Sequence, residues 1–307
     1  MIVPARNAEA TLPRTLEALA RQDFDAPFEV IVVDNGSTDR TVELARAVEG
    51  PIRVLEQSNL GAAAGRNRGV AESSGPLLAF CDSDCFPTPG WLRAGVGALE
   101  STDLVQGHVL PDPTAELGPF DRSLWVTFEV GLYETASLFV TRRTFEQTGG
   151  FEEWISDHGR PIGEDLWFGW SARRLGARSS FCAEALAHHA VFPRGWREYA
   201  GERRRLRSFP AIAAKVPELR LCFFYRRLFL NRRSAALDTA LAGAVAALVA
   251  RSPFPLLLGL PYARMVVKRS RGWPGQQPRV AAGEVISDLV GLASLAQGTL
   301  RYRSLLL

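Results

Sequence analysis

Short apolar runs alternate with amphipathic stretches through the first third of the chain. In the stretch after the first run, Leu12, Leu16 and Leu19 are spaced for one buried helix face. The apolar runs themselves have the length and composition of strands buried on both faces of a parallel sheet. Strands are therefore predicted at 1–3, 28–33, 52–55 and 77–81, with helices at 12–19, at 41–48, around Arg66 and at 91–100. Strand and helix alternating at this spacing predict a doubly wound α/β sheet with right-handed crossovers.

The pattern is less regular between residues 104 and 175. Strands are expected at 104–109 and 137–141, and the aromatic stretch at 120–133 is predicted to be helical. Gly149, Gly150 and Phe151 mark a sharp turn. A further helix is expected at 166–175, opened by Glu164 and Asp165, where the helix dipole favours carboxylates.

Beyond residue 181 the composition changes. Arginines crowd into 194–207 and recur to Arg233. Two apolar segments follow at 237–250 and 254–267, divided by Arg251. Each is shorter than the roughly 20 residues that cross a bilayer, and a single span would place Arg251 near its centre at a cost of about 3 kcal/mol. The pair is expected to be re-entrant or to lie on a membrane surface. The alternative is a helical subdomain that packs on the sheet. A last amphipathic helix is expected at 284–297.

Charge and cysteine content limit the class of partner and the cellular compartment that are expected. The net charge of +3 is too small to indicate a nucleic-acid partner, although clustered arginines attract anionic lipid by about 1 kcal/mol per residue. The four cysteines show neither a CxxC pair nor zinc-ligand spacing, so free thiols in a reducing compartment are expected, with the cytosol as the default. No signal peptide opens the chain, and its first strand is short enough that the natural start is expected upstream.

One of the apolar runs is followed directly by acidic residues. The run at 77–81 is followed at once by Asp82, Ser83 and Asp84. These carboxylates would lie at the carboxyl end of a central strand, where open α/β sheets bind ligands, and hard oxygen ligands there suit Mg²⁺ or Mn²⁺ with a diphosphate. The alternative is a strand-ending turn with a helix cap.

Three further polar stretches are predicted to reach the same edge of the sheet. They are 4–7, which contains Pro4, Ala5 and Asn7; 34–39, which contains Asp34 and Gly36; and 66–68, which contains Arg66. Each follows a predicted strand or lies on the helix after one, so parallel topology would bring all of them close to Asp82 and Asp84.

Six stretches together resemble the family-2 glycosyltransferases, which have the GT-A fold. They are VPARN, VIVVDNGSTDRT, NLGAAAGRNRG, AFCDSDC, GGFEE and GEDLWFGW, and the resemblance covers roughly residues 1–189. The resemblance implies transfer of a sugar from a nucleotide diphosphate to an acceptor hydroxyl, with a divalent metal and inversion at the anomeric carbon. It also implies a GT-A domain at 1–215, with a nucleotide half at 1–110 and an acceptor half at 111–215. A helical, partly apolar region at 216–307 would follow.

The resemblance also assigns roles. Asp34 would bind the nucleotide base, Arg66 the nucleotide or its phosphates, and Asp82 the ribose or sugar. Pro4, Ala5, Asn7, Gly36 and Ser83 complete the implied nucleotide site. Asp165 would be the general base. Glu164 belongs either to the acceptor site or to the helix start.

The implied metal ligands are Asp84 and His188. The adjacent His189 leaves the choice of histidine open, and a solvated or hydrogen-bonded histidine is the ordinary alternative. Many family members carry another acidic residue after the Asp-x-Asp motif, where this chain has Cys85. Asp84 would therefore be the chief carboxylate ligand.

The donor, acceptor and rival functions are expectations of the same kind. UDP is favoured because Asp34 fits the imide of a pyrimidine, although guanine also offers donors. The acceptor would be a lipid-linked saccharide, a cell-envelope glycan or a small metabolite, at the cytoplasmic face of a membrane. A sugar nucleotidyltransferase would instead need a glycine-rich opening loop, which VPARNAEA lacks. A non-catalytic membrane-associated scaffold would have lost the Asp-x-Asp or Glu-Asp motif, and both are present.

Overall fold

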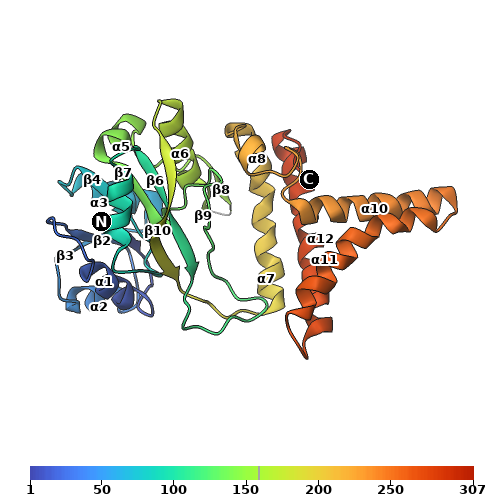
Figure 1. Ribbon diagram of the computed structural model, residues 1–307, viewed down its shortest axis with the longest axis horizontal. Coiled ribbons are helices and arrows are strands. Elements are labelled where there is room, and N and C mark those ends of the chain that lie inside the picture. The colour runs from blue at the N-terminus through green and yellow to red at the C-terminus, as the bar shows by residue number, and fades with distance from the viewer. Residues whose placement is uncertain (158–159) are drawn as a thin grey trace. The chain divides into compact units, whose positions relative to one another are not determined.

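The structure is a computed structural model that describes residues 1–157 and 160–307 (Figure 1). The chain divides into two compact units. Unit 1 comprises residues 1–116 and 123–192, and unit 2 comprises residues 117–122 and 193–307. The chain thus leaves unit 1 earlier than the predicted boundary at 215. The reason is that the helices over 196–215 pack against a long helix near the carboxyl end of the chain.

Unit 1 is built on an eight-stranded sheet with the order β3-β2-β1-β4-β7-β6-β10-β5. The first four of these strands run parallel, as the sequence predicted, while β7 and β5 are antiparallel to their neighbours. The strands are β1 (Ile2–Ala5), β2 (Val30–Asn35), β3 (Ile52–Gln57), β4 (Leu77–Phe80), β5 (Cys85–Pro87), β6 (Leu104–Pro111), β7 (Leu138–Thr141) and β10 (Ser179–His189), and a separate ribbon pairs β8 (Ser156–Asp157) with β9 (Arg160–Pro161).

Helices cover both faces of this sheet because successive strand residues point to opposite sides. Val30 and Val32 of β2 enter one core with helices α1, α2 and α4. Ile31 and Val33 enter the other core with α3, α5 and α6. The helical segments of unit 1 are α1 (Leu12–Ala20), α2 (Thr41–Ala47), α3 (Ala62–Ala71), α4 (Trp91–Ala98), η1 (Thr135–Ser137), α5 (Arg142–Thr148) and α6 (Glu164–Arg174). The doubly wound α/β prediction is confirmed.

The prediction of a helix at 120–133 was wrong, because the stretch is irregular. Its apolar residues are anchored in different places. Val126 makes an isolated bridge with Val109, and Phe120 lies in unit 2. Gly131 and Tyr133 have positive φ values of 81° and 54°, which a continuous right-handed helix excludes. Tertiary contacts thus override a locally helical pattern.

Unit 2 is organised around the helix α12 (Gln277–Tyr302), which packs against α7, η2, α8 and α11. The buried Glu284 on α12 forms ion pairs with two arginines. Its carboxylate lies 2.8 Å from Arg233 Nη1 and 3.2 Å from Arg269 Nε. Arg233 also binds Asp288 at 2.7 Å. The other helical segments are α7 (Trp196–Glu202), η2 (Arg203–Ser208), α8 (Phe209–Lys215), α9 (Leu219–Cys222), α10 (Arg232–Ala250), η3 (Phe254–Gly259) and α11 (Leu260–Arg271).

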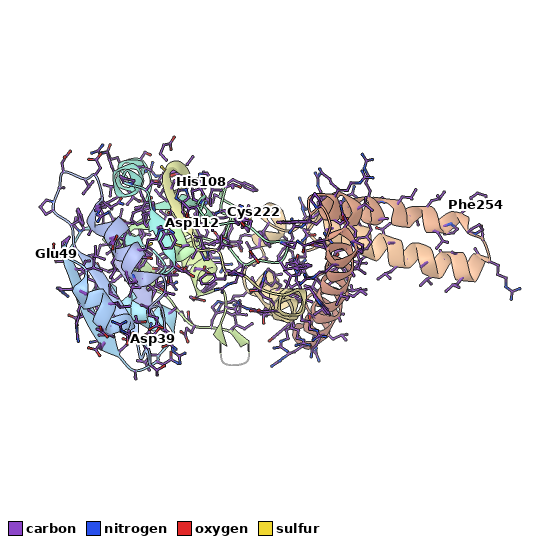
Figure 2. The ribbon with its side chains drawn as sticks, turned by 90° about the horizontal axis from the view of Figure 1, so that it is seen from below. Asp39, Glu49, His108, Asp112, Cys222 and Phe254 are labelled. Atoms are coloured by element: carbon purple, nitrogen blue, oxygen red, sulfur yellow. The ribbon has the colours of Figure 1, made fainter. Side chains whose placement is uncertain are left out.

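The segments α10, η3 and α11 form what we call the apolar hairpin, residues 232–271. Figure 2 shows Phe254 at its far end. The two arms meet closely at Gly243, where an added Cβ would lie 2.5 Å from the carbonyl oxygen of Pro255. Many side chains of the hairpin are exposed, including Leu248 at 80%, Val249 at 81% and Phe254 at 76%.

Two helices of the described chain, α10 and α12, are long and apolar enough to cross a membrane by length and composition. The first apolar segment was predicted to begin at 237, but α10 begins at Arg232 and has 19 residues. Its earlier start reflects an Asn231 capping box, in which the Asn231 side chain accepts hydrogen bonds from the N–H groups of Arg233 and Ser234. Length alone does not separate a spanning helix from the core helix of a folded unit, and the buried Glu284 places α12 in the core of unit 2.

Candidate active site

The carboxyl ends of β1, β2 and β4 border a cleft of about 700 Å³. This volume is within the roughly 300–1,000 Å³ typical of small-molecule sites. All four stretches that were predicted to converge reach this cleft, through Pro4, Asn35, Arg66 and Asp82. The lining residues are Pro4, Ala5, Arg6, Asn35, Asn59, Leu60, Gly61, Ala62, Arg66, Asp82, Ser83, Asp84 and Glu153. Several of these, including Arg6, Asn35, Asn59 and Glu153, were assigned no role from the sequence.

Arg66 joins two acidic motifs that are far apart in the chain. Its Nη2 lies 2.9 Å from Asp82 Oδ1, and its Nη1 lies 3.4 Å from Glu164 Oε1. The Arg66 side chain is only 6% exposed. Although burial alone would lower its pKa, Asp82 and Glu164 raise it, so the guanidinium stays charged. Arg66 therefore aligns the Asp-x-Asp turn with the start of α6, and both of its terminal nitrogens already have carboxylate partners.

The loop after β2 is held by its own polar side chains. Asp34 is buried, and its Oδ2 accepts hydrogen bonds from the N–H groups of Gly36 at 3.1 Å and Ser37 at 3.0 Å. Asn7 Oδ1 accepts from Thr38 N–H at 2.9 Å, which ties the first loop to the second. Asp34, Gly36 and Asn7 therefore shape the edge of the cleft without lining it, and Asn35 is the member of this loop that lines it.

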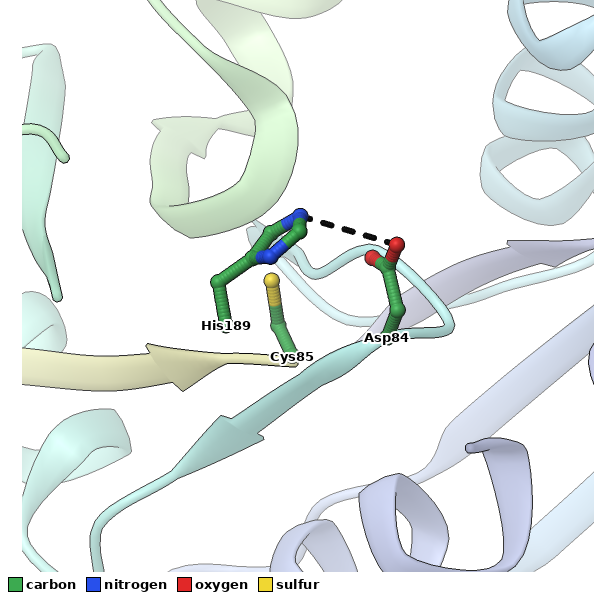
Figure 3. A group of neighbouring side chains, drawn as sticks. All are labelled: Asp84, Cys85 and His189. Atoms are coloured by element: carbon green, nitrogen blue, oxygen red, sulfur yellow. Dashed lines mark ion pairs between the residues drawn. The ribbon is translucent and has the colours of Figure 1, made fainter. Parts of the chain in front are cut away.

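Asp84, Cys85 and His189 form a mixed cluster beside the cleft (Figure 3). One possible ligand atom from each residue lies within 4.8 Å of the others, and His189 Nε2 is 3.5 Å from Asp84 Oδ2. An oxygen, a sulfur and a nitrogen donor converge, which fits a divalent transition-metal ion. We refer to these three residues as the Asp84 cluster.

The structure places His189 in this cluster, whereas the sequence had favoured His188. Strand β10 pairs antiparallel with β5, with His189 opposite Cys85 and His188 opposite Phe86. Because neighbouring strand residues face opposite sides, only one of the two histidines can point toward Asp84. His188 lies instead near the charges of Asp112 and Arg14, and burial lowers its pKa.

The hydrogen bond at the other ring nitrogen determines how His189 is oriented. Nδ1 lies 2.6 Å from the carbonyl oxygen of Ala190, which can only accept. In the neutral ring Nδ1 must therefore carry the proton, and Nε2 presents its lone pair toward Asp84. Support of this kind at the second ring nitrogen is typical of metal-binding histidines.

The amino end of α6 carries the second acidic motif. Gly163 has a φ of 74°, which lets the chain turn sharply into the helix. Asp165 Oδ1 accepts a hydrogen bond from Leu166 N–H at 2.8 Å. Burial raises the pKa of Asp165 well above its usual range, and the charges of Glu164 and Glu134 raise it further. A carboxyl with a raised pKa suits a general base near neutral pH.

Glu134 belongs to this acidic group but was not selected from the sequence. It comes directly before η1, just after the irregular stretch at 120–133 that was predicted to be helical. Burial raises its pKa to about 7. No motif or spacing marks it, since only the tertiary course of residues 120–137 brings it near α6.

Strands with helices on both faces, and an acidic turn beside a cleft at their carboxyl edge, are the features expected of the GT-A fold. A mannosyltransferase of Pyrobaculum calidifontis, solved with GDP-Man and Mn²⁺, aligns over 95% of this chain and 86% of its own, with a TM-score of 0.65 and 20% identity. TarS of S. aureus, solved with UDP-GlcNAc, aligns over 99% and 91%, with a TM-score of 0.52 and 18% identity. At these identities the likeness establishes the fold.

Sequence relatives define the family. Residues 1–151 match the model of glycosyl transferase family 2. The glycosyltransferase AglE of Haloferax volcanii is 30% identical over 210 residues, which cover 64% of this chain and 67% of AglE. The chain therefore belongs to glycosyltransferase family 2 and is a transferase enzyme. Validoxylamine A glucosyltransferase of Streptomyces hygroscopicus subsp. limoneus is 40% identical over 104 residues, but the match spans only 32% of this chain and 23% of that protein.

Proposed function

We propose that this protein transfers a glycosyl group from a nucleotide diphosphate, with UDP favoured, to an acceptor hydroxyl, with a divalent metal and inversion. The observation that carries the proposal is the contact of Arg66 with both Asp82 and Glu164. This contact sets the Asp-x-Asp turn and the Glu-Asp motif beside one cleft. Donor and proton acceptor would then meet at that cleft.

Each acidic residue has its own task in this proposal. Asp84 and His189 would hold the cation. When bound, the cation supplies Lewis-acid stabilisation of the charge that builds on the departing diphosphate. Asp165 takes the proton from the attacking hydroxyl, and Glu164 holds Arg66 and keeps the pKa of Asp165 raised. The hydroxyl attacks the anomeric carbon on the face opposite the diphosphate, which gives inversion.

The proposed donor site begins at Asn35 and Arg6 and ends at the Asp84 cluster. Asn35 Oδ1 accepts a hydrogen bond from Gln57 Nε2 at 2.5 Å, so its amide is oriented at the cleft wall. An amide can pair with the imide of uracil, and the loop that Asp34 organises supports it. Solved proteins of this fold contain both GDP-Man and UDP-GlcNAc, so the base needs a direct test.

Calorimetry of the full chain against UDP, GDP and TDP, each with Mn²⁺ and with chelator, tests the proposal. We expect binding of UDP that chelator abolishes. His189→Asn should weaken Mn²⁺-dependent binding by about 10–100-fold, while His188→Asn, its matched control, should leave it unchanged. Binding that survives chelator would contradict metal dependence, and selective binding of GDP would contradict the choice of donor.

We further propose that the apolar hairpin enters the cytoplasmic face of a membrane that carries the acceptor. Between Asp238 and Arg264 the sequence has one charged residue, Arg251. From Asp238 to Arg251 the helix extends about 20 Å, less than the roughly 30 Å of hydrocarbon in a bilayer. The hairpin can therefore enter the bilayer without crossing it.

The free energies favour insertion over solvation. Between Asp238 and Arg264, nine large apolar side chains of the hairpin are exposed: Leu241, Val245, Leu248, Val249, Phe254, Leu256, Leu257, Leu258 and Leu260. At about 0.3–0.6 kcal/mol each, they contribute roughly 4 kcal/mol, which outweighs about 3 kcal/mol for Arg251 at the bilayer centre. At the base of the hairpin, Arg232, Arg264 and Lys268 are exposed and add attraction to anionic headgroups.

Flotation with anionic vesicles tests membrane entry. We expect Leu248→Asp to reduce vesicle binding by about 100-fold, since a carboxylate at that depth costs about 3 kcal/mol. Leu300→Asp is the matched control, because Leu300 on α12 is 81% exposed and Leu248 is 80% exposed. Equal flotation of both variants would exclude the hairpin as the membrane-binding element. Both variants should bind nucleotide in solution equally well.

A further inference from the structure

Cys85 faces the same space as the two proposed metal ligands. It begins β5 directly opposite His189 on β10, so the two side chains share one face of the sheet. Its Sγ lies within 4.8 Å of the ligand atoms of Asp84 and His189, and Figure 3 shows it beside the imidazole ring of His189. Cys85 is fully buried, yet it borders a polar cluster.

The spacing of this group fits ligands of one cation. Metal bonds of about 2.1 Å at a tetrahedral angle separate a nitrogen and an oxygen ligand by about 3.4 Å. His189 Nε2 and Asp84 Oδ2 are 3.5 Å apart. A sulfur ligand binds at about 2.3 Å, so a third donor within 4.8 Å of both can reach the same ion after a small side-chain adjustment.

We propose that Cys85 Sγ is the third protein ligand of the catalytic cation, and that it shifts the site's preference from Mg²⁺ toward Mn²⁺ and softer ions such as Co²⁺ and Zn²⁺. The inference rests on the proposed function only in placing the cation at the Asp84 cluster. Carboxylate oxygens suit Mg²⁺, whereas thiolate and imidazole favour transition metals. A chain with a carboxylate in place of Cys85 would lack this preference.

Binding of the cation must displace a proton from the thiol. The thiolate is the metal-binding form, and one proton therefore leaves Sγ for solvent as the metal–sulfur bond forms.

Cys81 provides an internal control. It is as buried as Cys85 and only four residues away, but its Sγ contacts the carbonyl oxygens of Asp82 at 3.5 Å and Cys85 at 3.9 Å. It is not a member of the Asp84 cluster. A property that depends on any buried thiol next to the Asp-x-Asp turn should change equally in Cys81 and Cys85 variants, whereas coordination should depend on Cys85 alone.

The test is a titration of the full chain with Co²⁺, followed by absorbance. Thiolate bound to Co²⁺ gives a sulfur-to-metal charge-transfer band in the near ultraviolet. We expect the band in the wild type and in Cys81→Ser, and its loss in Cys85→Ser and Cys85→Ala. Co²⁺ affinity should fall by about 10–100-fold in the two Cys85 variants. Circular dichroism checks their fold.

Either of two spectral results would overturn the inference. Co²⁺ that binds without a charge-transfer band, or a band that persists in a folded Cys85 variant, excludes Cys85 as a ligand. In that case the proposed function stands if Mn²⁺-dependent UDP binding remains. If UDP binding does not depend on Mn²⁺ but the Co²⁺ charge-transfer band is present, the proposed function is contradicted. The assignment of Cys85 as a metal ligand would still hold.

Discussion

Each unit contains a cluster of arginines and carboxylates, and the two clusters differ in their balance of charge. In unit 2, Glu284 and Asp288 face Arg233 and Arg269, so two negative groups meet two positive ones. In unit 1, Arg66 contacts Asp82 and Glu164, and Asp165 adds a third carboxylate beside them. The first cluster compensates its own charge. The second has an excess of negative charge at the wall of a cleft.

The difference separates a structural cluster from a functional one. Balanced ion pairs need no further partner, and the pairs of unit 2 fasten α10 and α11 to α12. An excess of carboxylates costs folding free energy unless a proton or a cation compensates it. Here the pKa of Asp165 is raised, and Asp84 borders a mixed donor cluster. The imbalance therefore indicates where protons and cations bind.

Among variants that test this difference between the two clusters, Asp165→Asn is expected to have the largest effect. Loss of the general base should lower kcat by about 10²–10⁴-fold while UDP binding is retained. A carboxyl whose pKa is higher in the folded than in the unfolded state destabilises the fold at a pH above the unfolded value. The variant's Tm at neutral pH should therefore equal or exceed that of the wild type. Retained turnover would remove Asp165 from the mechanism, and a lowered Tm would contradict the excess of charge.

The opposite result is expected in unit 2. Glu284→Ala removes the carboxylate shared by Arg233 and Arg269, and we expect a loss of about 3 kcal/mol of stability by denaturant unfolding. Glu43→Ala is the control, because it breaks a pair with Arg40 in which both side chains are exposed, so its effect on stability should be much smaller. Equal stability of the two variants would show that the cluster of unit 2 does not fasten its helices.

The smallest effect concerns pH. Turnover should fall as pH is lowered through the raised pKa of Asp165, because the base becomes protonated. Glu134→Gln removes one charge that raises this pKa, so the acid limb of the kcat profile should move to lower pH. Glu129→Gln is the control, since Glu129 on the same stretch contacts Tyr133 and Arg173 instead. An acid limb unchanged by Glu134→Gln would exclude coupling between Glu134 and Asp165.

Sequence periodicity was sufficient for the four parallel strands and the helices that follow the first three of them, although it did not predict β5. Leu12, Leu16 and Leu19 do form the buried face of α1, and the turn at Gly149 and Gly150 has the positive φ values that glycine permits. The meeting of Arg66 with Asp82 also followed, because parallel strands place their carboxyl ends at one edge. These features depend on local pattern and on the handedness of crossovers, which the sequence expresses directly.

Other features depended on register and on long-range contacts. The choice of His189 over His188 is a question of one residue in the pairing of β10 with β5, and a shift by one would reverse both side chains. Glu134 reaches Asp165 through a stretch that lacks the helix its pattern predicts.

By itself, then, the sequence determined the doubly wound sheet, the edge at which its polar loops meet and the family to which the chain belongs. Only the tertiary structure decided which histidine joins Asp84, that Cys85 lies with them, and that the arginines of unit 2 bind their own carboxylates. The physical reason is that helix and strand periodicities are short-range, whereas a site is assembled by contacts between residues such as Arg66 and Glu164, 98 positions apart.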